Sequence, residues 1–122
     1  TEESGLIGSC GMSFDCRRVK FDKCGGCGVT AWNTKGRLTN CQVTNCQRSG
    51  VNSCGTIEIE GEESRINNNC TDGDSNYYGM KASDSSSIIH LLSPLTKEDV
   101  STNNNGGGNY GGDGTIKTVN SF

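Results

Sequence analysis

Eight cysteines are the residues of this chain with the clearest capacity for chemistry. All of them lie within residues 10–70, and none follows. An even set of cysteines in a small chain rich in Gly and Asn is typical of a disulfide framework formed in an oxidising compartment. Each bridge would stabilise the fold by about 2–4 kcal/mol, because it restricts the unfolded chain. We therefore predict four disulfides, with pairing left open, among Cys10, Cys16, Cys24, Cys27, Cys41, Cys46, Cys54 and Cys70.

The same cysteines allow a metal site as an alternative. Two residues separate Cys24 from Cys27, and this spacing lets both thiolates bind one tetrahedral ion. Cys41 and Cys46 could complete the site, although their separation is wider. In this second hypothesis the cofactor is zinc and the protein is a zinc-stabilised binding module that acts inside a cell. In the first hypothesis there is no metal and no cofactor.

Histidine and acidic residues provide little evidence for catalysis. His90 is the only histidine, so a mechanism that needs two imidazoles is excluded. Its neighbours Ile89 and Leu91 predict a partly buried side chain. Glu58 and Glu60 alternate with isoleucines, which predicts that they lie on the solvated side of a strand. A small secreted hydrolase that uses His90 with an acid is the third hypothesis, and we predict no catalytic residue.

Two short motifs have structural explanations. Residues 72–76 alternate oxygen-bearing side chains as the first half of a calcium loop does, but Tyr77 and Ser83 occupy positions that would complete the loop. An Asx-type turn accounts better for this segment. Asn69 begins an N-glycosylation pattern with Cys70 and Thr71, and a bridge at Cys70 would hinder its modification.

Two groups of side chains are candidates for binding. The basic group is compact in sequence and suits an acidic surface, whereas tyrosine offers a large contact area with a polar tip. The alternative for the basic group is an edge strand protected by charge, and for the tyrosines it is local packing. The predicted binding residues are Arg17, Arg18, Lys20, Lys23, Tyr77, Tyr78 and Tyr110.

Composition limits the class of protein. Only 21 of the 122 residues are Leu, Ile, Val or Phe, which is too few for an extensive core. No apolar run is long enough to span a membrane. The net charge of −3 and the pI near 5.0 argue against sequence-specific nucleic-acid binding. Thr1, Glu2 and Glu3 lack the features of a signal peptide, so under the secretion hypothesis we expect a mature chain.

The apolar pattern favours short strands in the first half of the chain. Residues 13–22 alternate apolar with polar, which predicts one long or bulged strand. Residues 29–33 and 37–43 are predicted to form a hairpin. The strict alternation of residues 56–60 predicts a strand that turns back into residues 64–68. We find no internal sequence repeat of 20 to 50 residues.

The second half combines strands, a helical turn and a loop. Residues 88–92 fit a short helix or a buried strand equally well. Thr96 precedes Asp99 by three residues, as in a helix capping box, and predicts a single helical turn. Residues 103–114 contain one aromatic and no aliphatic residue, which predicts a mobile surface loop. Alternation resumes at residues 115–119 and predicts a final strand.

These observations lead to one main hypothesis. We expect a single mainly-β domain over residues 1–122, a small disulfide-stabilised antiparallel sheet or sandwich of hairpins with at most one or two short helices. Residues 10–70 would form its cysteine-rich β region, and residues 71–122 its cysteine-free β and loop region. In size and composition the chain resembles small secreted cysteine-rich proteins that microbes release as effectors or toxins. That resemblance implies an extracellular, non-catalytic protein that binds a protein or glycan of a host or competitor.

Overall fold

The computed structural model describes residues 6–9 and 13–122, with the first of these ranges described as backbone only. Strands make up 50% of the chain and helix 4%, which confirms a mainly-β protein. Every strand pair in the two sheets is parallel. The chain therefore winds repeatedly in one direction and does not fold back on itself in hairpins.

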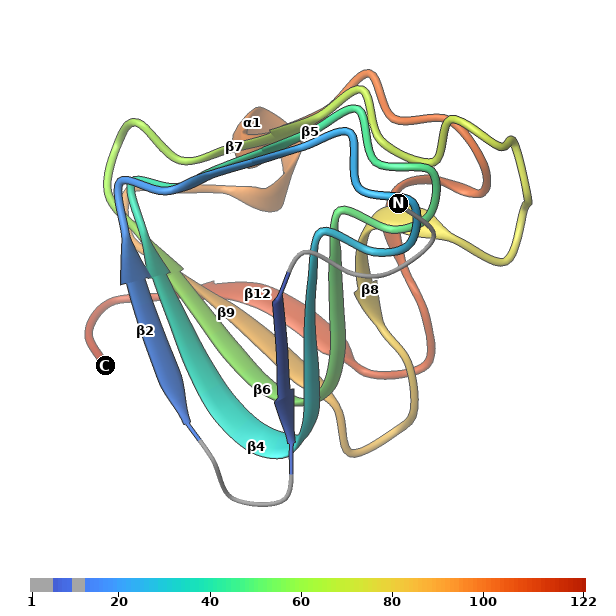
Figure 1. Cartoon of the computed structure of the whole chain (residues 1–122). Coiled ribbons are helices and arrows are strands. Elements are labelled where there is room, and N and C mark those ends of the chain that lie inside the picture. Colours follow the sequence, from blue (N-terminus) through green and yellow to red (C-terminus); the bar gives the residue numbers. More distant parts are fainter. Residues whose placement is uncertain (1–5, 10–12) are drawn as a thin grey trace.

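Successive windings stack as coils around a common axis (Figure 1). Each coil places a strand directly beside the equivalent strand of the coil before it, so that one position recurs at Leu6, Val29, Val51, Met80 and Tyr110. This arrangement is a parallel β-solenoid, in which each coil contacts its neighbours only. The spacing between equivalent residues is near 22 in the early coils and longer later, because later coils carry larger loops.

Three faces surround the axis. The first face contains β2 (Phe14–Arg17), the second halves of β4 (Val29–Thr39) and β6 (Val51–Glu60), then β9 (Ile88–Leu92) and β12 (Thr115–Val119). The second face is a four-stranded sheet of β3 (Lys20–Asp22), β5 (Gln42–Thr44), β7 (Arg65–Asn67) and β10 (Ser101–Thr102). The third face contains β1 (Leu6–Ser9), the first halves of β4 and β6, β8 (Tyr78–Ala82) and β11 (Gly108–Gly111).

Residues in the left-handed backbone region form the corners between the faces. Arg18, Asn40 and Gly61 follow equivalent strand ends and have φ values of 55°, 51° and 96°. The other end of the second face turns at the stacked residues Lys23, Asn45, Asn68 and Asn103, all with φ between 55° and 60°. Asn adopts this conformation more readily than most residues, so it recurs where the coil must turn sharply.

The core lies inside the coils and consists of stacked aliphatic rows. One row runs from Gly36 through Ile57 and Ile89 to Ile116, and most of its members are fully buried. A second row on the same face joins Leu38, Ile59 and Leu91. Because each inward residue packs on the equivalent residue of the next coil, a small number of aliphatic side chains produces a continuous core.

Asparagine side chains extend the core at one corner, where they form a ladder of hydrogen bonds. Asn69 is fully buried; its Oδ1 accepts from the Cys46 N–H at 3.0 Å and its Nδ2 donates to the Val43 carbonyl at 2.9 Å. Asn104 repeats the arrangement one coil later, because its Oδ1 accepts from the Asn69 N–H at 2.9 Å and its Nδ2 donates to the Ile66 carbonyl at 3.2 Å. The amides thus satisfy backbone groups that the corner leaves without strand partners.

The predicted antiparallel fold is wrong. Residues 13–22 form two strands on different faces, separated by the corner at Arg18. The predicted hairpin between residues 29 and 43 is instead the single strand β4, which bends at Asn33, followed by a corner and β5. Residues 56–60 and 65–67 pair with strands of other coils and not with each other. The hairpin predictions assume that each short polar turn reverses the direction of the chain. In the structure these turns only redirect the chain from one face of the solenoid to the next.

The predicted disulfide framework is also not present among the described residues. The seven described cysteines are free thiols, and Cys10 lies outside the described residues. The parallel stacking accounts for the stability that we had assigned to disulfides, since ladder hydrogen bonds and aliphatic rows connect every coil to the next.

Several local predictions are confirmed. The helical turn is α1 (Lys97–Val100), in which the Thr96 hydroxyl accepts from the Asp99 N–H at 3.2 Å. The final strand is β12, and residues 88–92 form the strand β9. The structure places β11 within residues 103–114, so part of the predicted loop pairs with β8.

Candidate functional site

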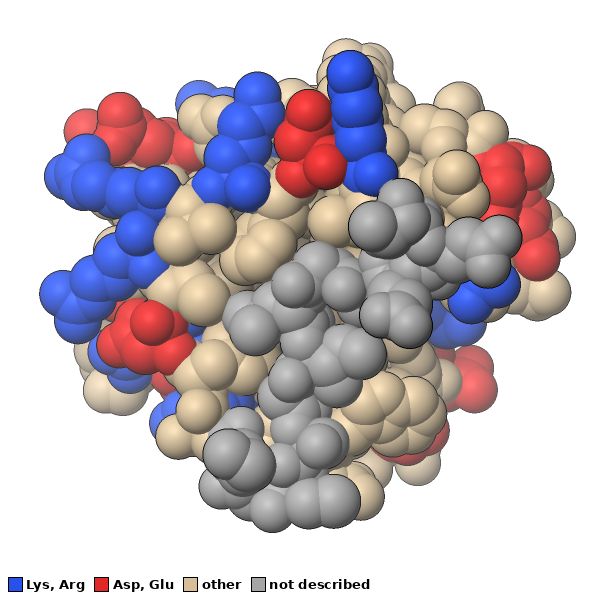
Figure 2. All heavy atoms as spheres, in the orientation of Figure 1, with Lys and Arg blue, Asp and Glu red and all other residues tan. Residues whose placement is uncertain are grey.

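The four predicted basic residues all lie on the first coil. Arg17 ends β2, Arg18 forms the corner, Lys20 begins β3 and Lys23 follows it. All four are exposed, and we call them the basic rim. Figure 2 shows lysine and arginine side chains along the left and upper border of this view of the molecule.

A shallow hollow of about 260 Å³ lies at the corner of the basic rim. Its charged groups are Arg18, Lys20 and Glu63, and two side-chain amides, of Asn40 and Gln42, lie between them. Asn40 Oδ1 accepts from the Glu63 N–H at 3.1 Å, and among the described residues its amide nitrogen donates no hydrogen bond. The hollow therefore presents hydrogen-bond donors and positive charge together.

Acidic neighbours partly neutralise the basic rim. Arg17 pairs with Asp15 at 3.6 Å, and Arg18 pairs with Glu63 at 3.3 Å, but the side chains of both arginines remain 70% and 76% exposed. Asp22 accepts hydrogen bonds from Thr44 and Asn45, and these bonds lower its pKa. Exposed ion pairs of this kind contribute little energy, so the arginines can exchange their partners for those of a ligand.

The tyrosines belong to other coils. Tyr77 contacts two cations: the Arg48 guanidinium lies 5.5 Å and the Lys81 ammonium 5.3 Å from the centre of its ring. Lys81 also donates to the Asn76 carbonyl at 2.7 Å. Arg48 and Lys81 were not among the predicted binding residues, because they lie 29 and 4 residues from Tyr77 along the chain and come together only in the stacked coils.

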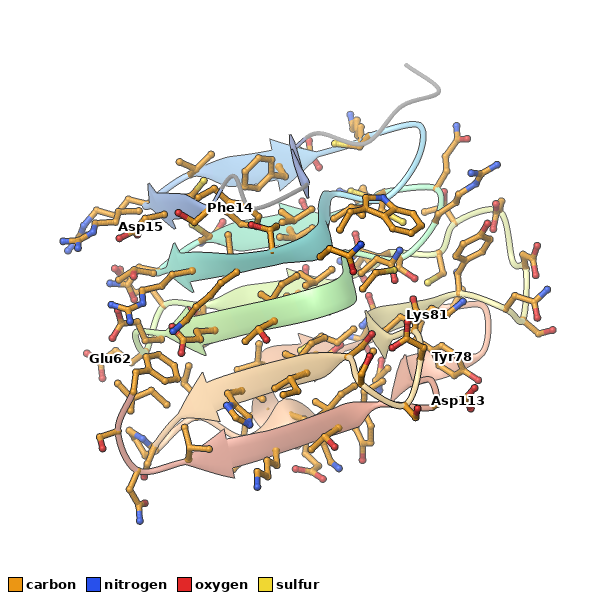
Figure 3. The ribbon with its side chains drawn as sticks, turned by 90° about the horizontal axis from the view of Figure 1, so that it is seen from below. Phe14, Asp15, Glu62, Tyr78, Lys81 and Asp113 are labelled. Carbon is orange, nitrogen blue, oxygen red and sulfur yellow. The ribbon has the colours of Figure 1, made fainter. Side chains whose placement is uncertain are left out.

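Tyr78 and Tyr110 have structural roles. Tyr78 lies against Gly107 and Gly111, where any larger side chain would collide with its ring. Tyr110 packs against the core near the last coil; its hydroxyl donates to Glu98 at 3.2 Å, and this bond raises its pKa. Figure 3 shows Tyr78 and Lys81 far from Asp15 of the first coil. The structure thus assembles the basic rim but does not join it to the tyrosines.

The outer side of the first face carries a row of ionisable residues. Glu58 is only 5% exposed and accepts from Arg37 at 3.1 Å, with Lys35 at 3.3 Å on its other oxygen. The prediction of a solvated Glu58 is therefore wrong, because two cations cover its carboxylate. Half-buried His90 occupies the register position between Glu58 and Lys117. Glu58 bonds to these cations, and no hydrogen bond between it and His90 is present among the described residues.

The cysteines of the zinc alternative are separated. The thiols of Cys24 and Cys46 share a hydrogen bond, whereas Cys41 donates to the Cys16 carbonyl at 3.3 Å at the opposite end of β5. Within residues 13–122, no three His, Cys, Asp or Glu side chains are grouped as ligands for one metal ion. Burial raises the pKa of Cys46 to about 12, so its thiol is protonated at neutral pH.

The two short motifs are explained by backbone geometry. Asp72 and Asp74 each accept from the N–H two residues later, at 3.0 and 2.9 Å, as the predicted Asx turns require. Asn69 is 0% exposed and its side-chain amide is fully hydrogen-bonded, so its nitrogen is inaccessible to glycosylation in the folded chain.

Comparisons with known proteins assign no family. No family model, curated protein or solved structure matches the chain. Among the described residues, no helix is long and apolar enough to cross a membrane.

Proposed function

We propose that this protein is a non-catalytic recognition module that binds an acidic glycan of a host or competitor through the basic rim. The observation that carries the proposal is that the first coil carries four exposed cations, of which two line the corner hollow: Arg18 and Lys20 in the hollow, with Arg17 and Lys23 beside them along the chain. A fold of this kind does not itself imply a function, so only the chemistry of this site supports the proposal.

The chemistry of the hollow favours a glycan as the ligand. Carboxylate or sulfate groups would pair with Arg18 and Lys20, and the amides of Asn40 and Gln42 suit sugar hydroxyls. The hollow is shallow and polar, which suits a ligand that stays largely hydrated. An acidic protein surface is the alternative partner, and the binding experiment below separates the two.

We also propose an extracellular site of action, as the composition predicts. Because the described thiols are free, this part of the proposal rests on the overall composition and not on disulfides. Immunoblots of the medium and of the lysate of the producing cells test it separately from binding. Protein confined to the lysate would overturn the extracellular site of action while leaving the binding site unaffected.

The binding proposal is tested by reversing charge at the rim. Arg17→Glu combined with Arg18→Glu should weaken binding to a heparin column or to fluorescent heparin about tenfold or more at low salt, since both arginines are exposed and can exchange their weak surface ion pairs for pairs with sulfates. Poly-glutamate serves as the acidic-protein probe. Circular dichroism should show that the variant keeps the fold of the parent.

A matched control places the same charge change far from the rim. Arg48→Glu combined with Lys81→Glu alters the two cations that flank Tyr77, and we expect heparin binding close to that of the parent. Unchanged binding after the rim reversal would refute the proposal. Loss only in the control variant would move the site to the cations around Tyr77, and stronger binding of poly-glutamate than heparin would replace the glycan with a protein.

A further inference from the structure

The two ends of the solenoid carry unpaired strand edges on the first face. In the described part of the chain, β2 pairs only with β4 and β12 pairs only with β9, so each has one free edge. Figure 3 shows these strands at opposite borders of the stack, with Phe14 and Asp15 at the β2 border. An unpaired edge is a template for a further strand.

The hydrogen-bonding pattern of the two edges is complementary. The Thr115 N–H donates to Ser87 and the Val119 carbonyl accepts from Ser93, so the backbone groups of the residues between them at 116 and 118 point away from β9. At the other end, the Arg18 N–H donates to Thr39. The alternation then leaves the backbone groups of residues 15 and 17 on the free edge of β2. A parallel ladder between β12 and β2 would join the free backbone groups of residues 116 and 118 to those of residues 15 and 17.

If β2 of a second copy continued the register of the first face beyond β12, the apolar side chains of the two strands would pack on each other. Each internal step of the first face places Phe14, Gly36, Ile57, Ile89 and Ile116 in one inward row. Phe14 and Ile116, at the two ends of this row, are only partly buried against the core. If β2 of another copy followed β12, Phe14 would cover Ile116 and both side chains would lose exposed apolar surface.

Charge is complementary in that register. The outward row that begins with Asp15 continues through Arg37, Glu58 and His90 and ends at Lys117, so a following copy would place Asp15 beside Lys117.

The whole molecule is polarised in the same sense. Residues 1–50 contain seven basic and four acidic side chains, whereas residues 51–122 contain four basic and ten acidic ones. Opposite ends therefore attract each other, and like ends repel.

We propose that a second copy of this chain docks head to tail, with its β2 edge on the β12 edge of the first copy. The contact joins two different surfaces, so each added copy exposes a new β12 edge and growth produces open linear assemblies.

Lys97 competes for the β12 edge. Its ammonium lies 3.5 Å from the Ile116 carbonyl and 4.7 Å from the centre of the Tyr110 ring. This carbonyl is one of the acceptors that an added strand would use, so Lys97 must move when the second copy docks. Removing the Lys97 ammonium should therefore favour association.

The test is a charge exchange measured by sedimentation velocity over a range of protein concentrations. The parent should form concentration-dependent linear oligomers at low salt. Lys117→Glu alone and Asp15→Lys alone should each raise the concentration needed for association about tenfold, and the double variant should restore it, because the charges are exchanged between copies. Lys97→Ala should lower that concentration.

Arg65→Glu is the matched control, since it makes the same charge change on β7, away from both ends. A parent that remains monomeric at every concentration would overturn the proposal. Closed dimers that no end variant affects would overturn it as well, and so would a double variant that associates no better than the single variants.

Discussion

At the scale of single residues, asparagine carries much of the architecture. Asn45, Asn68 and Asn103 occupy equivalent corners in the left-handed region, and the next residue in the later two coils is the ladder residue Asn69 or Asn104. The same residue type thus serves two functions, because its side chain tolerates positive φ and also hydrogen-bonds backbone groups. In the two earlier coils Cys24 and Cys46 take the ladder position, which explains why these thiols meet.

The asparagine ladder leads to a stability prediction. Asn69→Ala should lower the free energy of unfolding by about 2–4 kcal/mol, since the Cys46 N–H and the Val43 carbonyl would lose their partners inside the core. Urea unfolding followed by circular dichroism measures the change. Asn105→Ala removes an exposed amide next to the ladder and should change stability by no more than about 0.5 kcal/mol. Equal effects of the two substitutions would contradict the role of the ladder.

At this scale the sequence contained a signal that we did not use. Asn40, Asn45, Asn68 and Asn103 each follow a short strand-like run, and each has positive φ in the structure. A recurring Asn at the ends of alternating runs indicates coil corners, whereas the amide hydrogen bonds of Asn69 depend on the neighbouring coils and had no local signal.

At the scale of elements, alternation identified strands but not their partners. The patterns at residues 56–60 and 115–119 correspond to β6 and β12, and the Thr96 cap correctly predicted α1. The assumed hairpin near residues 34–36 was wrong because β4 continues through this segment. Alternation reports which side of a strand is buried, and it is the same for parallel and antiparallel neighbours.

Close packing between β2 and β4 gives a prediction for one element pair. The Phe14 ring lies directly over Gly36, in the space that a Cβ would occupy. Gly36→Ala should displace the ring and lower the free energy of unfolding by about 1–3 kcal/mol. Thermal and urea unfolding measure this loss.

A double-variant cycle separates this contact from a general effect of alanine in the strand. In a Phe14→Leu background the side chain facing residue 36 is smaller, so Gly36→Ala should cost less there than in the parent. The same loss in both backgrounds would show that contact with the ring is not the cause.

At the scale of the whole molecule, coil stacking resolves the shortage of apolar residues. The chain has few large aliphatic side chains, but Ile57, Ile59, Ile89 and Leu91 lie in adjacent rows and are almost completely buried. The sequence analysis found no repeat because the coils share a backbone register and an inward aliphatic pattern, and not a sequence motif. Differences in loop length between coils also remove any fixed period.

This account predicts that the fold persists without disulfides. Reductant should leave the circular dichroism spectrum and the melting temperature of the native protein nearly unchanged, since the described thiols are free and the parallel ladders join the coils. Loss of a native bridge from a fold that depends on it costs about 2–5 kcal/mol, so a disulfide-dependent fold would melt at a clearly lower temperature after reduction. Protein that is kept reduced by a thiol reductant, without alkylation, and fails to refold after dilution from urea would show that covalent bridges, and not coil stacking, compensate for the small core.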